Sequence, residues 1–159
     1  RGPGRAGKRT GRALMRVSEE FVKERILDVE PVPGDPTLLF PDMEYVCETE
    51  EILDLQWRLV GIPILSIFTE DELVRKTLPG ETDKEAQERF ESVRRWMEDQ
   101  GAESALSQSP VLLLLDEGDL ILIDGWHRCV VAHADFGMSE ITAMIGSKAE
   151  HELNTMPEP

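Results

Sequence analysis

The 159-residue chain has little of several residue types, and each shortage excludes a class of protein. Its two cysteines, Cys47 and Cys129, lie far apart and outside any metal-ligand spacing, which argues against a disulfide framework and a zinc site. No apolar run reaches the roughly 18 residues of a membrane span, and no basic-then-apolar leader marks a secretion signal. These shortages predict a cytoplasmic protein with reduced, packed thiols and no membrane partner.

Basic residues are also scarce, with 17 Lys and Arg against 32 Asp and Glu and a formal net charge of −15. Six of the basic residues lie within residues 1–16, which contain no acid, so the rest of the chain has a net charge of −21. Such a body repels nucleic acid, because duplex binding depends on Lys and Arg side chains that neutralise phosphates. Nucleic-acid contact is therefore expected only through the basic arm or through metal ions, whereas a protein partner with a basic surface suits the charge.

The sequence does contain enough apolar residues, 40%, for one globular domain with a sizeable core. We expect an α+β domain with a small mixed β-sheet packed with helices. We expect four segments: a flexible basic arm over 1–16, an N-terminal extension packed on the core over 17–60, the core over 61–146, and a polar tail over 147–159.

Capping and turn signals divide the chain into short elements. Ser18 predicts the start of a helix to about residue 28, residues 43–47 form a possible short strand, and residues 52–60 fit either a helix or a strand. In the core we expect a strand over 62–68, a helix from the capping box Thr69–Glu72 to residue 79, a longer helix from Thr82 to Gly101, a hairpin of strands 111–115 and 120–123, a helix ending at Gly137, and a strand over 141–145.

The most informative stretch is the end of the second hairpin strand, where the aliphatic residues 120–123 are followed by a short polar turn. A run of four aliphatics suits a strand covered on both faces, and the apolar residues after the turn suit a buried helix. Asp124 is expected to cap this helix, and Gly125 lets the backbone approach a ligand closely. The N–H groups of the first helical turn, beside Arg128, form a potential anion site.

Each polar or aromatic residue of the turn also has an alternative interpretation. Arg128 matches phosphate geometry, but it could instead pair with one of the many carboxylates. His127 could bind phosphate, transfer protons or pack locally, and Trp126 could stack on a base or join the core. Asp124 and the acids at 70–72 could aid a metal or water, or simply favour the helix N-termini beside them.

The order of these elements resembles the ParB/sulfiredoxin-like superfamily. The shared signature is an apolar strand, a turn of the type Gly-x-His-Arg or Gly-x-Arg-Arg, a helix with a small-residue, Gly-ended exit, and another strand. The matching segments here are 121–128, 132–134, 136–137 and 141–145, with 61–67 as the first core strand and 109–115 as the strand before the turn. The resemblance covers about residues 60 to 146.

The resemblance implies nucleotide binding, with ATP, CTP or another NTP and Mg²⁺ as cofactors and NTP hydrolysis or nuclease activity as the reaction. It places Gly125, Trp126, His127 and Arg128 around the nucleotide, His127 and Glu70 in catalysis, and Asp124 and Glu70 at the metal.

The sequence departs from both founding groups of this superfamily. Sulfiredoxins carry their reactive cysteine immediately before the His-Arg pair, where this chain has Trp126, and Cys129 is expected to be buried. ParB-type proteins continue into a DNA-reading helix-turn-helix, and few residues follow the last expected strand here, so chromosome partition is not expected. Two alternatives stay open: a non-enzymatic acidic protein that inhibits a basic partner, and a small-molecule phosphotransferase.

Overall fold

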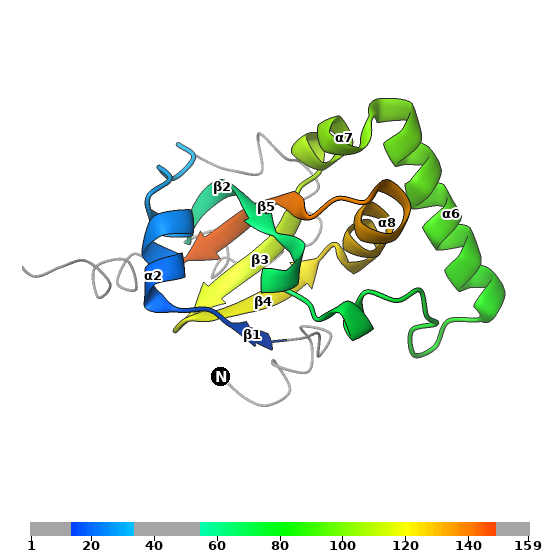
Figure 1. The fold of residues 1–159 in the computed structure, drawn as a ribbon, viewed down its shortest axis with the longest axis horizontal. Helices are drawn as coiled ribbons and strands as arrows, with labels where there is room; N and C mark the ends of the chain where they lie inside the picture. Colours follow the sequence, from blue (N-terminus) through cyan, green and yellow to red (C-terminus); the bar gives the residue numbers. More distant parts are fainter. Residues whose placement is uncertain (1–13, 34–54, 149–159) are drawn as a thin grey trace, which may run out of the picture.

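The computed structural model describes residues 14–33 and 55–148, which form an α+β fold around a five-stranded mixed sheet (Figure 1). The spatial order of the strands is β1 (Leu14–Arg16), β4 (Asp119–Asp124), β3 (Val111–Asp116), β5 (Glu140–Ser147) and β2 (Gln56–Pro63). Neighbouring strands are antiparallel, except for the parallel pair of β3 and β5. This confirms the expected α+β class and mixed sheet.

Helices pack on one face of the sheet and form the main core with it. They are α2 (Glu19–Phe21) with the π-helix η1 (Val22–Leu27), α6 (Asp83–Gln100), α7 (Ala102–Gln108) and α8 (Trp126–Phe136). In Figure 1, α6, α7 and α8 gather at one end of the sheet and α2 lies at the other. Alternate residues of the strands face opposite ways, so Leu112, Leu114 and Met144 form a second, smaller cluster with Trp57 on the other face. No helix among the described residues has the length and apolar character needed to cross a membrane.

The helix ends follow the capping signals closely in two places. Ser18 caps α2, because its hydroxyl oxygen accepts a hydrogen bond from the Phe21 N–H at 3.0 Å. At α6 the Thr82 hydroxyl accepts from the Glu85 N–H at 3.1 Å, and the Glu85 carboxylate accepts from the Thr82 N–H at 2.8 Å. The hydrogen bond from the Thr82 N–H to the carboxylate lowers the pKa of Glu85. Both helix starts were therefore predictable from local sequence.

The strand expected over 62–68 is wrong in its position. Strand β2 spans Gln56–Pro63 and is followed by a single 3-10 turn, Ile64–Ser66. Proline lacks the N–H that would continue the ladder, and the Ser66 hydroxyl donates to the Pro63 carbonyl at 2.6 Å, which stabilises the turn. The ambiguous segment 52–60 is thus a strand from Gln56 onward, and β2 crosses the expected boundary at 60/61.

The helix expected from Thr69 to residue 79 is also wrong. A capping box is present at Thr69 and Glu72, but it opens only a 3-10 turn, Glu70–Glu72. The Glu72 carbonyl accepts a hydrogen bond from the Trp126 indole N–H at 3.0 Å, so this tertiary contact takes an acceptor that a continuing helix would use. The hydrogen bond from the indole therefore ends the helical turn that the capping box begins.

Two further elements extend the sequence-based description. Gly101 ends α6 as expected, but it also precedes the unexpected helix α7. Strand β1 pairs with β4 at one edge of the sheet, so residues 14–16 of the expected basic arm belong to the sheet, and β5 continues to Ser147. The possible strand over 43–47, Cys47, residues 1–13 and the tail beyond 148 lie outside the described residues.

Candidate functional site

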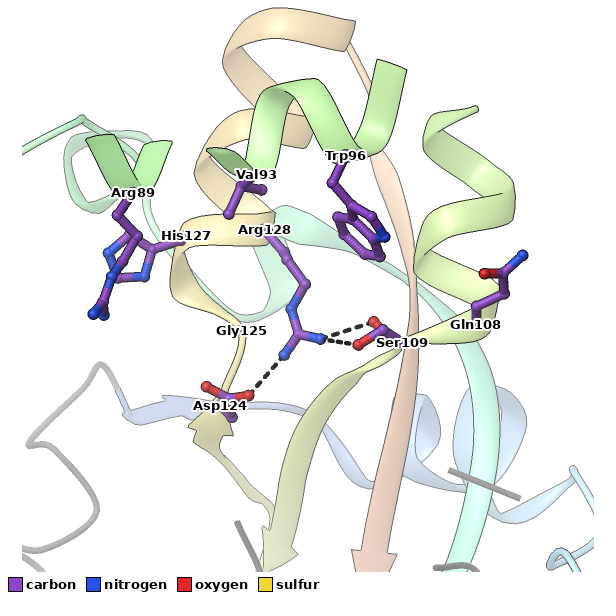
Figure 2. A pocket seen from close by; sticks show the side chains of 9 residues that line it. All are labelled: Arg89, Val93, Trp96, Gln108, Ser109, Asp124, Gly125, His127 and Arg128. Atoms are coloured by element: carbon purple, nitrogen blue, oxygen red, sulfur yellow. Dashed lines mark hydrogen bonds and ion pairs between the residues drawn. The ribbon is translucent and has the colours of Figure 1, made fainter. Parts of the chain in front are cut away.

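A cavity of about 490 Å³ lies where β4 ends and α8 begins, between this turn, α6 and the end of α7 (Figure 2). Ligand pockets usually have volumes of about 300–1,000 Å³, so the space suits a small molecule. Strand β4 ends at Asp124 and α8 starts at Trp126, as the aliphatic run and polar turn predict. The lining residues are Arg89, Val93, Trp96, Gln108, Ser109, Asp124, Gly125, His127 and Arg128.

Gly125 is required by the turn itself. Its φ of 125° is unfavourable for residues with a side chain, and a Cβ atom there would lie 2.9 Å from Val111 Cγ1 and 3.2 Å from Arg128 Nη2. Gly125 also occupies the N-cap position of α8, so no side chain caps this helix. The expected helix cap by Asp124 is therefore wrong, because the strand continues through Asp124 and the chain turns one residue later.

Arg128 forms the ion pair that was the alternative to phosphate binding. Its Nη2 donates to Asp124 Oδ2 at 2.9 Å, and its Nη1 donates to the Ser109 carbonyl and hydroxyl at 2.9 and 2.7 Å. Only 13% of the Arg128 side chain is exposed. Three of its five N–H donors are thus used within the chain, and Arg128 connects the end of β4 to the segment between α7 and β3.

His127 lines the cavity and contains an unusual polar atom. Its Nε2 is buried and has no hydrogen-bond partner among the described residues. The ring packs against Phe90 and Trp126 at centroid distances of 5.0 and 4.9 Å. Burial lowers the pKa of His127 below its usual 6.5, and the nearby Arg89 guanidinium lowers it further. A neutral imidazole with an unsatisfied nitrogen is a suitable hydrogen-bonding group for a ligand.

Trp126 belongs to the core, the second of its two alternatives. The side chain is 4% exposed and meets Phe90 edge-to-face at 5.5 Å. Its indole N–H is the donor to the Glu72 carbonyl, which joins the start of α8 to the 3-10 turn. These contacts leave Trp126 as a support of the neighbouring His127 and do not place it among the lining residues of the cavity.

The acids expected at a metal site do not come together in the cavity. Asp124 lines the cavity, but one of its oxygens already accepts from Arg128, and Glu70 is not a lining residue. Among residues 14–33 and 55–148, no three His, Cys, Asp or Glu side chains are placed to hold a metal ion. The described residues therefore do not fit a Mg²⁺ ion held by protein ligands.

Arg89 is a site residue that sequence reasoning missed. It lies on α6, and the same face of the helix contributes Val93 and Trp96 to the cavity (Figure 2). The side chain is 59% exposed, and its nearest acid is Glu81, at 4.0 Å from Nε. The spacing of 89, 93 and 96 is helical, so a second face of α6 was recognisable, but nothing in the sequence relates it to the turn before α8.

Cys129 is buried, as expected from the apolar residues after it. It is fully shielded from solvent, and burial raises the pKa of its thiol to about 12. A thiol in this environment is not a nucleophile at neutral pH.

Comparisons with known proteins return no relative for this chain: no family model matches it, and neither the curated proteins nor the solved structures include a significant match.

Proposed function

We propose that this chain is a nucleotide-binding domain of the ParB/sulfiredoxin-like type, with the phosphates of the nucleotide beside Arg89 and His127. The observation that carries the proposal is the cavity at the start of α8, which is lined by an exposed arginine, Arg89, and by His127, whose buried Nε2 has no hydrogen-bond partner among the described residues. A phosphate oxygen can accept from Arg89, and an anion beside His127 favours its protonated form, in which both ring nitrogens donate.

The local charge supports an anionic ligand despite the acidity of the chain. The lining residues include two arginines and one carboxylate, and that carboxylate is paired with Arg128. The first turn of α8 adds the positive end of the helix dipole, without a side-chain cap at Gly125. Arg128 then serves mainly to position the turn, and Arg89 takes the phosphate-binding role that the sequence assigned to Arg128.

Binding is better supported than hydrolysis. The acid expected to act in catalysis, Glu70, does not line the cavity, and the described residues do not fit a metal held by the protein. A Mg²⁺ ion in this proposal arrives already bound to the nucleotide phosphates, and we derive no reaction step through it.

The proposal is tested by thermal unfolding in the presence of ATP, CTP, GTP or UTP at millimolar concentration and low salt, with and without Mg²⁺. A ligand that binds only the folded state raises its unfolding free energy by mass action, by about 2.7 kcal/mol when the ligand is at 100 times its Kd. For a chain of this size this corresponds to roughly 5–10 °C. If no nucleotide raises the melting temperature, the proposal is wrong. If a nucleotide does bind and phosphate is released from it, hydrolysis is part of the function.

Two variants connect the shift to the cavity. Arg89→Gln should weaken nucleotide binding about ten- to a hundredfold, because it removes a charge-assisted hydrogen bond worth about 1.5–3 kcal/mol. Arg94→Gln is the matched control, because it removes the same charge from the same helix. Arg94, like Arg89, pairs with acids, but it does not line the cavity. Equal affinities in the two variants would place the phosphates elsewhere.

The net charge favours a second candidate, an acidic protein that binds a basic partner without catalysis. A charge of −15 on 159 residues is a strong field for such a partner. This candidate is favoured if no nucleotide changes the melting temperature and a polycation such as polylysine forms a salt-sensitive complex with the chain.

A further inference from the structure

The cavity has two chemically different ends. In Figure 2, Arg89 and His127 lie on one side of Arg128, and Trp96 and Gln108 lie on the other. The first side contains the exposed cation and the unpartnered imidazole nitrogen. The second side contains an indole and a carboxamide and no charged group. A ligand that fills the whole cavity must therefore be anionic at one end and neutral and flat or apolar at the other.

Trp96 is the residue that defines the neutral end. The buried face of α6 is formed by Ala86, Phe90 and Met97. Trp96 lies beside this face, is partly buried, packs against the main core and also lines the cavity. An indole that lines a small-molecule cavity is suited to stack on another ring. Stacking between a base and an aromatic side chain contributes substantially to nucleic-acid binding and tolerates any base.

Gln108 supplies hydrogen-bonding groups next to this surface. It is the last residue of α7 and is exposed, and its side chain makes a long hydrogen bond, from Nε2 to the Ser104 hydroxyl at 3.3 Å. A carboxamide both donates and accepts, which allows it to pair with the edge of a heterocyclic base.

We infer that the neutral end of the cavity holds the base of the nucleotide, stacked on Trp96 and contacted at its edge by the Gln108 carboxamide. This inference rests on the proposed function and adds the base-binding residues to it. The ligand class is a mononucleotide whose phosphates reach Arg89 and His127 while its base lies between α6 and the end of α7.

Tryptophan fluorescence gives a direct test, because the chain has three tryptophans and the other two, Trp57 and Trp126, are 1% and 4% exposed. Titration of the unmodified chain with an NTP should quench its emission, whereas tripolyphosphate, which has no base, should bind without comparable quenching. Trp96→Phe should abolish the quenching but retain most of the NTP affinity, because phenylalanine still stacks.

Affinities measured by calorimetry separate stacking from a merely structural role. Trp96→Ala should weaken NTP binding about ten- to a hundredfold and leave tripolyphosphate binding unchanged. Equal losses for both ligands, or unchanged NTP affinity, would overturn the base site while leaving the phosphate site intact. If neither ligand binds the unmodified protein, the proposed function fails and the base site fails with it.

Gln108→Leu tests the edge contact separately. Leucine has a similar size but no hydrogen-bonding atoms. The differences in affinity among ATP, CTP, GTP and UTP should therefore become smaller. If these differences in affinity are unchanged, Gln108 does not contact the base.

Discussion

At the scale of single residues, sequence reasoning located the turn that lines the cavity but not all the contacts of its side chains. The sequence predicts the turn at Gly125, the burial of Cys129 and the ion-pairing alternative for Arg128, because each depends on neighbours within about four residues. The use of Arg128 as a connection to Ser109 could not be predicted, since these residues are 19 positions apart and meet only through the fold. Arg89 was missed for the same reason.

His127 gives a residue-scale prediction about pH. Its pKa is lowered in the folded state, so below its usual value of 6.5 the unfolded chain binds more protons than the folded one. The free energy of unfolding should therefore be highest above pH 6.5, fall as the pH decreases from 6.5 to the folded pKa, and show no further effect of this group below that. Urea unfolding at pH 5.5, 6.5 and 7.5 measures the change.

Replacement by glutamine isolates this contribution. His127→Gln should show a smaller loss of stability between pH 7.5 and 5.5 than the unmodified chain does. The same pH profile in the unmodified protein and in His127→Gln would show that the ring is freely solvated in solution.

At the scale of elements, local signals located the helix starts that depend on nearby side chains and failed where contacts between distant residues decide the structure. The starts of α2 and α6 follow from side-chain caps that act within three residues. The predicted position of strand β2 was wrong because the inward face of the strand includes a charged residue, Arg58. This residue is 1% exposed and donates to the Val29 carbonyl at 2.7 Å. A buried arginine with a distant acceptor breaks the apolar alternation by which strands are recognised. The prediction of a helix after Thr69 failed for a similar reason, because the Trp126 indole N–H donates to the Glu72 carbonyl from a distant part of the chain.

The connection between β4 and α8 gives the element-scale prediction. Gly125→Ala should lower the free energy of unfolding by about 2–4 kcal/mol, because it combines an unfavourable positive φ with a methyl group placed against Val111. Gly137→Ala is the matched control: its φ is 62° at the other end of α8, and a Cβ there meets no atom within 4 Å. It should lose only about 1–2 kcal/mol.

Urea unfolding of the two variants measures the difference. Equal losses would mean that the chain near Val111 moves to admit the methyl group and to relax the backbone. A larger loss at Gly125 would show that the turn is held in place, because a φ of 125° is less favourable for alanine than the left-handed φ of 62° and because the methyl group meets Val111.

At the scale of the whole molecule, composition predicted the class of fold and the mixed sheet, but not the strand order. The order β1-β4-β3-β5-β2 depends on which strands meet across long separations, and the residues that pair β2 with β5 lie about 80 positions apart in the sequence. What composition does fix is the net charge of −15, which acts on every part of the chain at once.

This charge predicts that salt stabilises the folded state. The ion pairs of the described residues involve mostly exposed side chains, such as Arg16 with Asp119 and Arg25 with Glu140, and exposed pairs contribute little. Repulsion among the excess carboxylates should therefore dominate, and raising NaCl from about 0.01 to 0.15 M shortens the screening length from roughly 30 to 8 Å. We expect the melting temperature to rise by about 2–4 °C, equivalent to roughly 1 kcal/mol.

A less acidic variant checks that this rise comes from repulsion. The variant Asp99→Asn removes one exposed charge that pairs with no other described residue, and Asp99 lies at the unfavourable, negative end of the α6 dipole. The variant should melt at a higher temperature in low salt and gain less from added NaCl. Chloride is used because sulfate could occupy the proposed phosphate site and raise stability by binding. A melting temperature that falls with NaCl in the unmodified chain would mean that its ion pairs outweigh its net charge.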